Sequence, residues 1–341
     1  MSSLSCLLSL LLLLFSTLIP SVTSQQQPQW KTLAPLPTGP IHEHTAFVVS
    51  PTKIGILGGV LQTGGVLNTF YIYDIPLNTW TKSTQLPLAM NHANVAVVDG
   101  RVYLLGAMAG ASWAGTPRSW VLDFAGNNMS WKEIPSMPST SGEPRGSAVM
   151  GVYDKKVWLV SGKTRSGGES VATVSVFDTA ANRWLDTTRE IPEKARRIPE
   201  GRDHGGGGVI GSKFYQVGGS LGAIENRKDT VFVLDLLDLE KGWVTAKGRM
   251  PTPRRGFATG ILGNKIYTFG GEGNPDPKSN GVFKEVEVYD VEADAWSALA
   301  PMKIPRHGSS AVVLNGTVYI PGGGTASGMP ATDAFDALVV G

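Results

Sequence analysis

The chain has 341 residues, of which 42% are hydrophobic and 17% are charged, and its formal net charge is +2. These values are those of a globular protein with a large core. They exclude the strongly basic balance that is typical of nucleic-acid-binding proteins, so we expect no nucleic-acid partner.

The first 24 residues predict a secretory signal peptide. An uncharged apolar run from Leu7 to Ile19 is followed by small residues up to Ser24. The run is too short for a transmembrane helix, which needs about 20 apolar residues. No later run is apolar enough to cross a membrane. We therefore expect residues 25–341 to form a secreted protein without a membrane span.

Two further features accompany the predicted secretion. The only cysteine, Cys6, lies in the signal peptide, so the mature chain would have no disulfides. Two sequons, at Asn128 and Asn315, predict N-glycosylation on surface turns.

A repeat of about 50 residues runs through the rest of the chain. Each copy contains an apolar strand that ends in a glycine pair or a near pair. After each of the first five pairs comes an apolar strand with an aspartate, and then a tryptophan. Tight-turn dipeptides such as Asn315-Gly316 precede the pairs and predict hairpins. Each copy thus predicts four short antiparallel strands, a to d. The pairs end at Gly59, Ala107, Gly162, Gly219, Gly271 and Gly323.

This pattern resembles the Kelch repeat, and the resemblance covers essentially all of the mature chain. It implies an all-β fold, a six-bladed β-propeller of four-stranded antiparallel blades around a central channel. The sixth copy lacks its tryptophan, whereas the N-terminal segment has Trp30 followed by "LAPLP". We therefore expect the N-terminal strand to close the last blade within one domain, residues 25–341.

The residue 14 positions before each glycine pair is predicted to be structurally equivalent in all six blades: His44, His92, Ser147, His204, Gly256 and Gly308. The glycine run 205–208 then belongs to innermost strand a of the fourth blade, where glycine indicates a close backbone approach. No helix follows the run, which excludes a phosphate-binding loop. Its place inside a periodic strand excludes a flexible linker.

Charged residues lie just before these positions, where each d-to-a loop enters the next blade. We expect them to surround one mouth of the channel, together with the b-to-c loops, while both sequons lie on the opposite face. Such a mouth would be positive and rich in hydrogen-bond donors. Alternatively, each arginine is structural and binds only loop carbonyls. The predicted ligand-binding residues are His42, His44, His92, Arg145, Arg202, Asp203, His204, Arg254, Arg306, Trp113 and Arg165.

The histidines raise the alternative of a metal site. His42 and His44 share one face of a strand, and with His92 and His204 they could bind zinc, iron or copper. However, strands of different blades diverge, and no cysteine or close carboxylate cluster completes the set. We therefore predict neither a metal nor another cofactor. The copper chemistry of the Kelch-type galactose and glyoxal oxidases is excluded, because it needs a cysteine that the mature chain lacks. The E-x-x-x-D-x-x-x-H iron set of the Kelch proteins of glucosinolate breakdown has no match.

Two functions fit this sequence. The first is a monomeric binding module whose mouth holds a small anionic or polyhydroxy ligand, or a loop of a protein partner. The second is a non-redox enzyme, such as a cyclase or isomerase of a secretory-route biosynthetic pathway, that polarises its substrate with the same side chains. Whether the chain is an enzyme stays open at this point.

Overall fold

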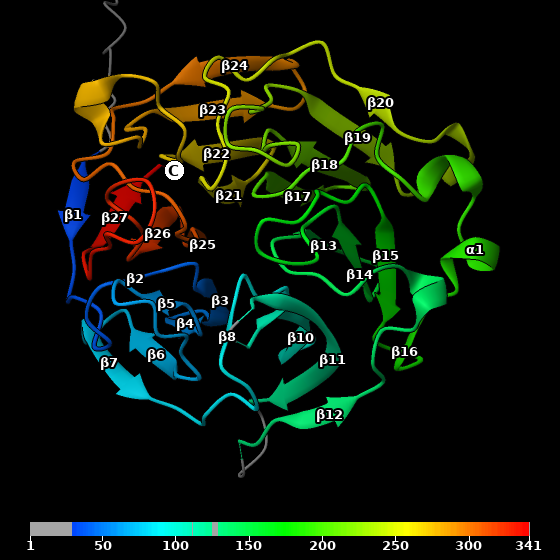
Figure 1. The fold of residues 1–341 in the computed structure, drawn as a ribbon, viewed down its shortest axis with the longest axis horizontal. Helices are drawn as coiled ribbons and strands as arrows, with labels where there is room; N and C mark the ends of the chain where they lie inside the picture. The colour runs from blue at the N-terminus through cyan, green and yellow to red at the C-terminus, as the bar shows by residue number, and fades with distance from the viewer. Residues whose placement is uncertain (1–28, 111, 125–128, 341) are drawn as a thin grey trace, which may run out of the picture.

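The computed structural model describes residues 29–110, 112–124 and 129–340. The predicted signal peptide and the Asn128 sequon lie outside these residues. Six antiparallel sheets surround a central axis, and Figure 1 shows them as six blades. The predicted six-bladed propeller is confirmed. Within the described residues, no helix is long and apolar enough to cross a bilayer.

Each blade has its first strand innermost, and the turn chemistry of the repeats sets the strand limits. The strands, blade by blade, are β3 (Thr45–Ser50), β4 (Lys53–Leu57), β6 (Phe70–Asp74) and β7 (Thr79–Lys82); β9 (Val95–Val98), β10 (Arg101–Ala109), β11 (Ala114–Asp123) and β12 (Lys132–Ile134); β13 (Val149–Tyr153), β14 (Lys156–Val160), β15 (Val174–Asp178) and β16 (Arg183–Trp184); β17 (Gly206–Ile210), β18 (Lys213–Val217), β19 (Val231–Asp235) and β20 (Val244–Thr245); β21 (Ala258–Leu262), β22 (Lys265–Phe269), β23 (Val286–Asp290) and β24 (Ala295–Ala298); β25 (Val312–Leu314), β26 (Thr317–Pro321), β27 (Phe335–Val339) and β1 (Trp30–Thr32).

Short elements lie between the blades. Strands β2 (Ile41–His42) and β5 (Val60–Leu61) pair near the channel mouth, and β8 (Met90–Asn91) pairs with the end of β10. The one short α-helix among the described residues is α1 (Thr187–Glu190), and four 3-10 turns are η1 (Ser139–Ser141), η2 (Glu193–Ala195), η3 (Leu239–Lys241) and η4 (Pro277–Ser279).

The N-terminal strand closes the sixth blade, as predicted. In β1, Trp30 is paired with Leu338 of β27, and Figure 1 shows these two strands side by side. The Trp30 indole N–H donates to the Pro301 carbonyl at 3.0 Å. The tryptophan of strand d makes the same bond to the preceding blade in three other blades, for example Trp184 to Pro135 at 2.9 Å. Trp30 therefore serves as the sixth outer tryptophan of the ring.

The glycine run lies where no side chain fits. A Cβ on Gly206 would overlap the Thr259 hydroxyl of the next blade, and one on Gly207 would overlap the Tyr215 carbonyl. Gly207 and Gly208 also have φ of +130° and +147°, a conformation that other residues rarely adopt. Close packing of neighbouring inner strands thus explains the run.

We predict that Gly207→Ala destabilises the protein by about 3 kcal/mol, because the new methyl group clashes with backbone and the positive φ adds strain. The control is Gly211→Asn, at a turn position with φ of +58°, where a Cβ would have no other atom within 4 Å. Asparagine tolerates this conformation, so its effect should stay below about 1 kcal/mol. Urea unfolding of both variants measures the difference. Equal losses would contradict the packing explanation.

Candidate functional site

Six equivalent residues form a closed ring at the channel mouth. Their backbone φ values lie between +49° and +62°. The backbone N–H of each bonds to the corresponding residue of the preceding blade, for example His92 to the Glu43 carbonyl at 3.0 Å and Glu43 to the Gly308 carbonyl at 2.6 Å. His204 is the exception, since its N–H donates to the Ser147 hydroxyl at 3.0 Å. The ring residues are Glu43, His92, Ser147, His204, Gly256 and Gly308.

The ring corrects the predicted equivalence in the first blade. Glu43, not His44, is the ring residue, because the β3–β4 hairpin has a bulge between Val48 and Ser50. The extra residue moves the ring position one place towards the N-terminus. His44 instead lies in the channel below the ring, and burial there lowers the pKa of its imidazole to about 4.

The four arginines do not line the mouth, so that expectation is wrong. Each is at most 1% exposed, and none of the four lines the mouth cavity. Arg145 donates to the carbonyls of Leu159, Ser161, Thr173 and Glu143. Three others bind acidic side chains: Arg202 with Glu200, Arg254 with Glu287, and Arg306 with Asp336. The alternative interpretation, in which these arginines are structural, is the one that the geometry supports.

A cavity of about 440 Å³ opens at the mouth. We call it the mouth cavity. Its polar lining residues include His42, Glu43, His92, Lys163, His204, Arg255, Glu272 and His307, and its apolar ones include Met108, Trp113, Ile224 and Met329. A second cavity, of about 340 Å³, lies in the channel, and Glu43, His92 and His204 line both. These three side chains therefore form the boundary between mouth and channel. Arg165 is exposed and is not among the lining residues.

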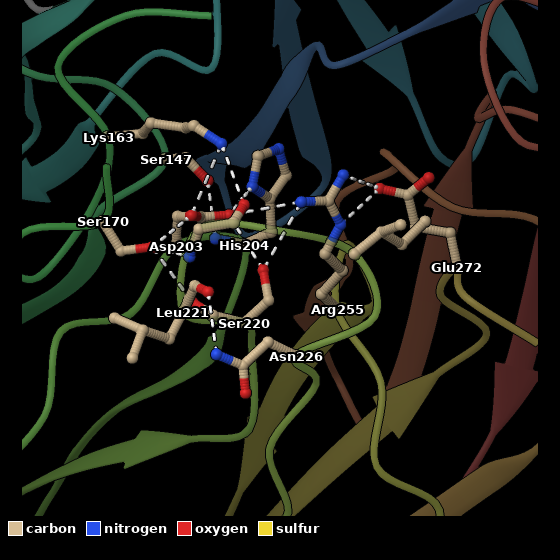
Figure 2. Close-up of polar contacts among 12 residues, drawn as sticks. Ser147, Lys163, Ser170, Asp203, His204, Ser220, Leu221, Asn226, Arg255 and Glu272 are labelled. Atoms are coloured by element: carbon tan, nitrogen blue, oxygen red, sulfur yellow. Dashed lines mark hydrogen bonds and ion pairs between the residues drawn. The ribbon is translucent and has the colours of Figure 1, made fainter. Parts of the chain in front are cut away.

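His204 is held by a buried carboxylate. Its Nδ1 lies 2.5 Å from Asp203 Oδ1, and Asp203 has no exposed surface. Asp203 also accepts hydrogen bonds from the Ser170 and Ser220 hydroxyls, as Figure 2 shows. An acceptor of this kind favours a proton on Nδ1 and directs Nε2 of His204 towards His92.

Two cations stand beside Asp203. Lys163 Nζ and Arg255 Nη1 each lie 3.6 Å from its carboxylate oxygens. Burial alone would raise the pKa of Asp203, but the hydrogen bond from His204 and the nearby positive charge hold it well below its usual range. Asp203 is therefore an ionised anchor beneath the mouth.

His92 is oriented in a similar way. Its Nδ1 lies 2.6 Å from the Asn91 side-chain oxygen, which accepts the Nδ1 proton. Its Nε2 lies 3.0 Å from Glu43 Oε2 and 3.0 Å from His204 Nε2, although residues 92 and 204 come from different blades. Contrary to expectation, the diverging strands bring these two histidines together, and Glu43 supplies the carboxylate that the sequence pattern did not show.

The charges at the mouth are compensated. Arg255 binds Glu272 at 2.8 Å, and Lys163 faces Asp203. Burial alone would raise the pKa of Glu43. The neighbouring His92 and His42 have a larger, opposite effect, so the pKa of Glu43 is well below its usual value. Histidines apart, the described lining residues of the mouth cavity hold two cations and two carboxylates. The expected positive mouth is not what the structure shows.

The remaining sequence-predicted residues lie around this centre. The Trp113 ring is 6.0 Å from the His92 ring. His42 lies against His307 with ring centroids 5.9 Å apart, and His307 Nε2 is 3.0 Å from the Ala326 carbonyl. Asn315 is exposed in the β25–β26 turn, at the end of the blade away from the mouth, as predicted. Ligand binding by the predicted residues and glycosylation stay predictions.

Comparison with known proteins agrees with this architecture. The KLHDC2/KLHL20/DRC7 Kelch-repeats domain matches residues 21–219 and 204–338. The Kelch-like protein terF of Aspergillus terreus is 35% identical over 94% of this chain and 71% of its own length. This chain belongs to the Kelch-repeat family.

Two other relatives match less of this chain. Human Kelch-like protein 34 is 26% identical over 74% of this chain, which spans only 37% of that protein. The N-acetylneuraminate epimerase of Vibrio cholerae is 33% identical over 38% of this chain and 30% of its own length. This chain therefore spans well under half the length of these two relatives.

Several mouth residues of this Kelch propeller were not among the predicted ligand-binding residues. Lys163 and Glu272 directly follow the glycine pairs of their blades, and each forms a β-bridge with the residue before a ring position, as in Arg255–Glu272. The position after the glycine pair is thus the sequence signal that identifies them. Glu43 was missed because the hairpin bulge shifts its register by one. The residues missed are Glu43, Lys163, Arg255, Glu272 and His307.

Proposed function

We propose that this Kelch propeller is a secreted binding protein whose mouth cavity holds a small polyhydroxy or carbonyl-rich organic molecule. The observation that carries the proposal is the mouth cavity itself, where hydrogen-bonding groups converge beside an apolar wall that includes Trp113, Met108 and Ile224. Ligand pockets commonly combine a mainly apolar lining with a few placed polar groups.

Charge compensation favours a neutral polyhydroxy ligand over a simple anion. Arg255 and Lys163 already face Glu272 and Asp203, so an anion would compete with carboxylates for them. A sugar-like or heteroatom-rich ligand can accept from the cations and donate to Glu43 and Glu272 without separating either pair. A loop of a protein partner could use the same groups, and secretion, glycosylation at Asn315 and a monomeric state belong to this proposal.

Native mass spectrometry of the protein purified from its source secretions tests the binding function. We expect a copurifying small molecule, released when Trp113 is changed. Trp113→Ala should weaken rebinding about tenfold or more, because the ring supplies a large contact area at the cavity. Lys155→Ala, in an exposed hairpin at the opposite end, is the matched control. Equal binding by both variants, or a bound protein in place of a small molecule, would contradict the proposal.

One observation favours an enzyme as the second candidate. The Asp203–His204 pair holds Nε2 of His204 at the cavity beside His92 and Glu43, the arrangement of an oriented general base. The partial similarity to a protein named N-acetylneuraminate epimerase also supports non-redox isomerase-type chemistry.

Turnover separates the two candidates. If the bound molecule is a substrate, His204→Ala should reduce turnover by at least about 100-fold, because a positioned acid or base contributes that much. Lys155→Ala, in the exposed hairpin at the opposite end, is the control and should retain turnover within a few-fold. The enzyme candidate would be wrong if the unmodified protein formed no product and the substitutions only weakened ligand binding by graded amounts.

A further inference from the structure

Three acceptor atoms meet at the boundary between mouth and channel. His92 Nε2 lies 3.0 Å from His204 Nε2 and 3.0 Å from Glu43 Oε2. One ligand atom from each of these three residues lies within 4.8 Å of the others. The three side chains are only 6–12% exposed.

The anchors of the two histidines decide where their protons are. His204 donates from Nδ1 to Asp203, and His92 donates from Nδ1 to the Asn91 side-chain oxygen. With an ion bound, both Nε2 atoms would direct their lone pairs at it, beside the Glu43 carboxylate. Without an ion, a proton on one Nε2 atom would link these side chains by hydrogen bonds, so metal binding would displace that proton.

From this geometry we infer that Glu43, His92 and His204 bind one first-row divalent transition-metal ion. Two imidazoles and one carboxylate form the ligand set of many Zn²⁺ and Fe²⁺ sites with open coordination positions. Metal-binding histidines almost always donate their other ring N–H to a carboxylate or an amide oxygen, as Asp203 and Asn91 accept here.

The distances agree with a single ion. Ligands about 2.1 Å from one ion lie roughly 3.0–3.4 Å apart when they are neighbours in octahedral or tetrahedral geometry. The two 3.0 Å separations fit this range. The third separation, between His204 Nε2 and the Glu43 carboxylate, is within 4.8 Å, and a small movement of the Glu43 side chain would shorten it. Because the three residues line both cavities, the ion would reach its site from the mouth, and its open positions would face the ligand cavity.

The repeat explains how such a site arises. The ring position brings one residue from each blade to the mouth, and in three blades that residue is glutamate or histidine. The chain has five histidines, and His42, His44 and His307 lie outside the set. They provide matched controls for the ligands.

Metal titration of the tag-free, chelator-treated protein tests the inference. We expect saturable uptake of one Co²⁺ per chain by calorimetry, with the visible absorption of a nitrogen- and oxygen-ligated ion. Glu43→Gln, His92→Ala and His204→Ala should each weaken Co²⁺ binding by about 100-fold or more, since even loss of an outer-shell anchor reduces metal affinity 10–100-fold. His307→Ala should change it less than about threefold, because this residue is not a ligand.

Each ligand variant is first compared with the unmodified protein by circular dichroism and urea unfolding. If a variant fails to fold, the ligands are identified instead by electron paramagnetic resonance of Cu²⁺ bound to the unmodified protein. We expect its spectrum to show two imidazole nitrogens bound to the copper. No saturable uptake at millimolar Co²⁺, binding that survives all three ligand substitutions, or a Cu²⁺ spectrum without imidazole nitrogen would overturn the site. The probe is the metal alone, so these outcomes leave the small-molecule proposal unaffected.

Discussion

Replacing Arg254 with methionine should reduce the free energy of unfolding by about 3–5 kcal/mol, because it leaves a buried carboxylate without its partner. Arg254 has no exposed surface, and its Nη1 donates to Glu287 at 2.6 Å. Its Nη2 donates to the Thr268 hydroxyl at 2.8 Å, and the guanidinium lies 5.7 Å from the Phe257 ring centre. Urea unfolding followed by tryptophan fluorescence measures the loss.

The exposed pair of Arg249 and Asp229 is the matched control in this part of the chain. Their side chains are 56% and 36% exposed at 2.8 Å separation, so Arg249→Met should change stability by less than about 1 kcal/mol. The double variant Arg254→Met with Glu287→Leu should lose less than Arg254→Met alone, since no unpaired charge is left. A native-like stability for Arg254→Met would instead place this arginine at the mouth, as the sequence first indicated.

Removal of the N-terminal strand should destabilise the propeller by about 4 kcal/mol or more, because the outer edge of the sixth blade then loses a whole strand. The truncated chain would begin at Ala34 and lack β1, whose backbone pairs with β27. Trp30→Ala alone should lose about 2–3 kcal/mol, since the half-buried indole packs on Phe269 and donates to Pro301. Thermal and urea unfolding measure both changes.

Lys31→Ala is the control for this strand, because the Lys31 side chain is exposed between two residues that pair with β27. It should unfold at nearly the same urea concentration as the unmodified protein. Unchanged stability of the truncated chain would mean that the ring does not depend on closure between its two ends.

The sequence predicts the architecture well because the repeated features are local. Glycine pairs, turn dipeptides and the spacing from aspartate to tryptophan each depend on one hairpin or one blade, and they recur along the chain. The lone Trp30 could be assigned to the sixth blade because its "LAPLP" continuation matches the segment after Trp296. The bond from Trp30 to Pro301 then confirms the assignment in three dimensions.

The site was less predictable because it depends on register and on side-chain direction. One extra residue in the β3–β4 hairpin moves the first blade by one place, and no turn signal marks that bulge. Arg254 and Arg306 sit two residues before ring positions, yet their side chains point into the blades. Their partners Glu287 and Asp336 lie on the third strand of each blade, about 30 residues away, where a sequence pattern shows no pairing.

The sequence gives least information about which side chains from different blades meet at the mouth. His92 and His204 are 112 residues apart, and only closure of the ring brings their Nε2 atoms to 3.0 Å. The balance of charge at the mouth is likewise set by neighbours from different loops, such as Lys163 beside Asp203. Counting basic residues along the chain therefore overestimates the positive charge of the mouth.

A crystal structure of the Zn²⁺-treated protein, with anomalous diffraction recorded at the zinc edge, tests the convergence of Glu43, His92 and His204 most directly. We expect one strong anomalous peak at the boundary of the two cavities, bonded to one carboxylate oxygen and two Nε2 atoms. A peak bonded to other side chains, or a map in which the two imidazoles turn away from each other, would contradict it.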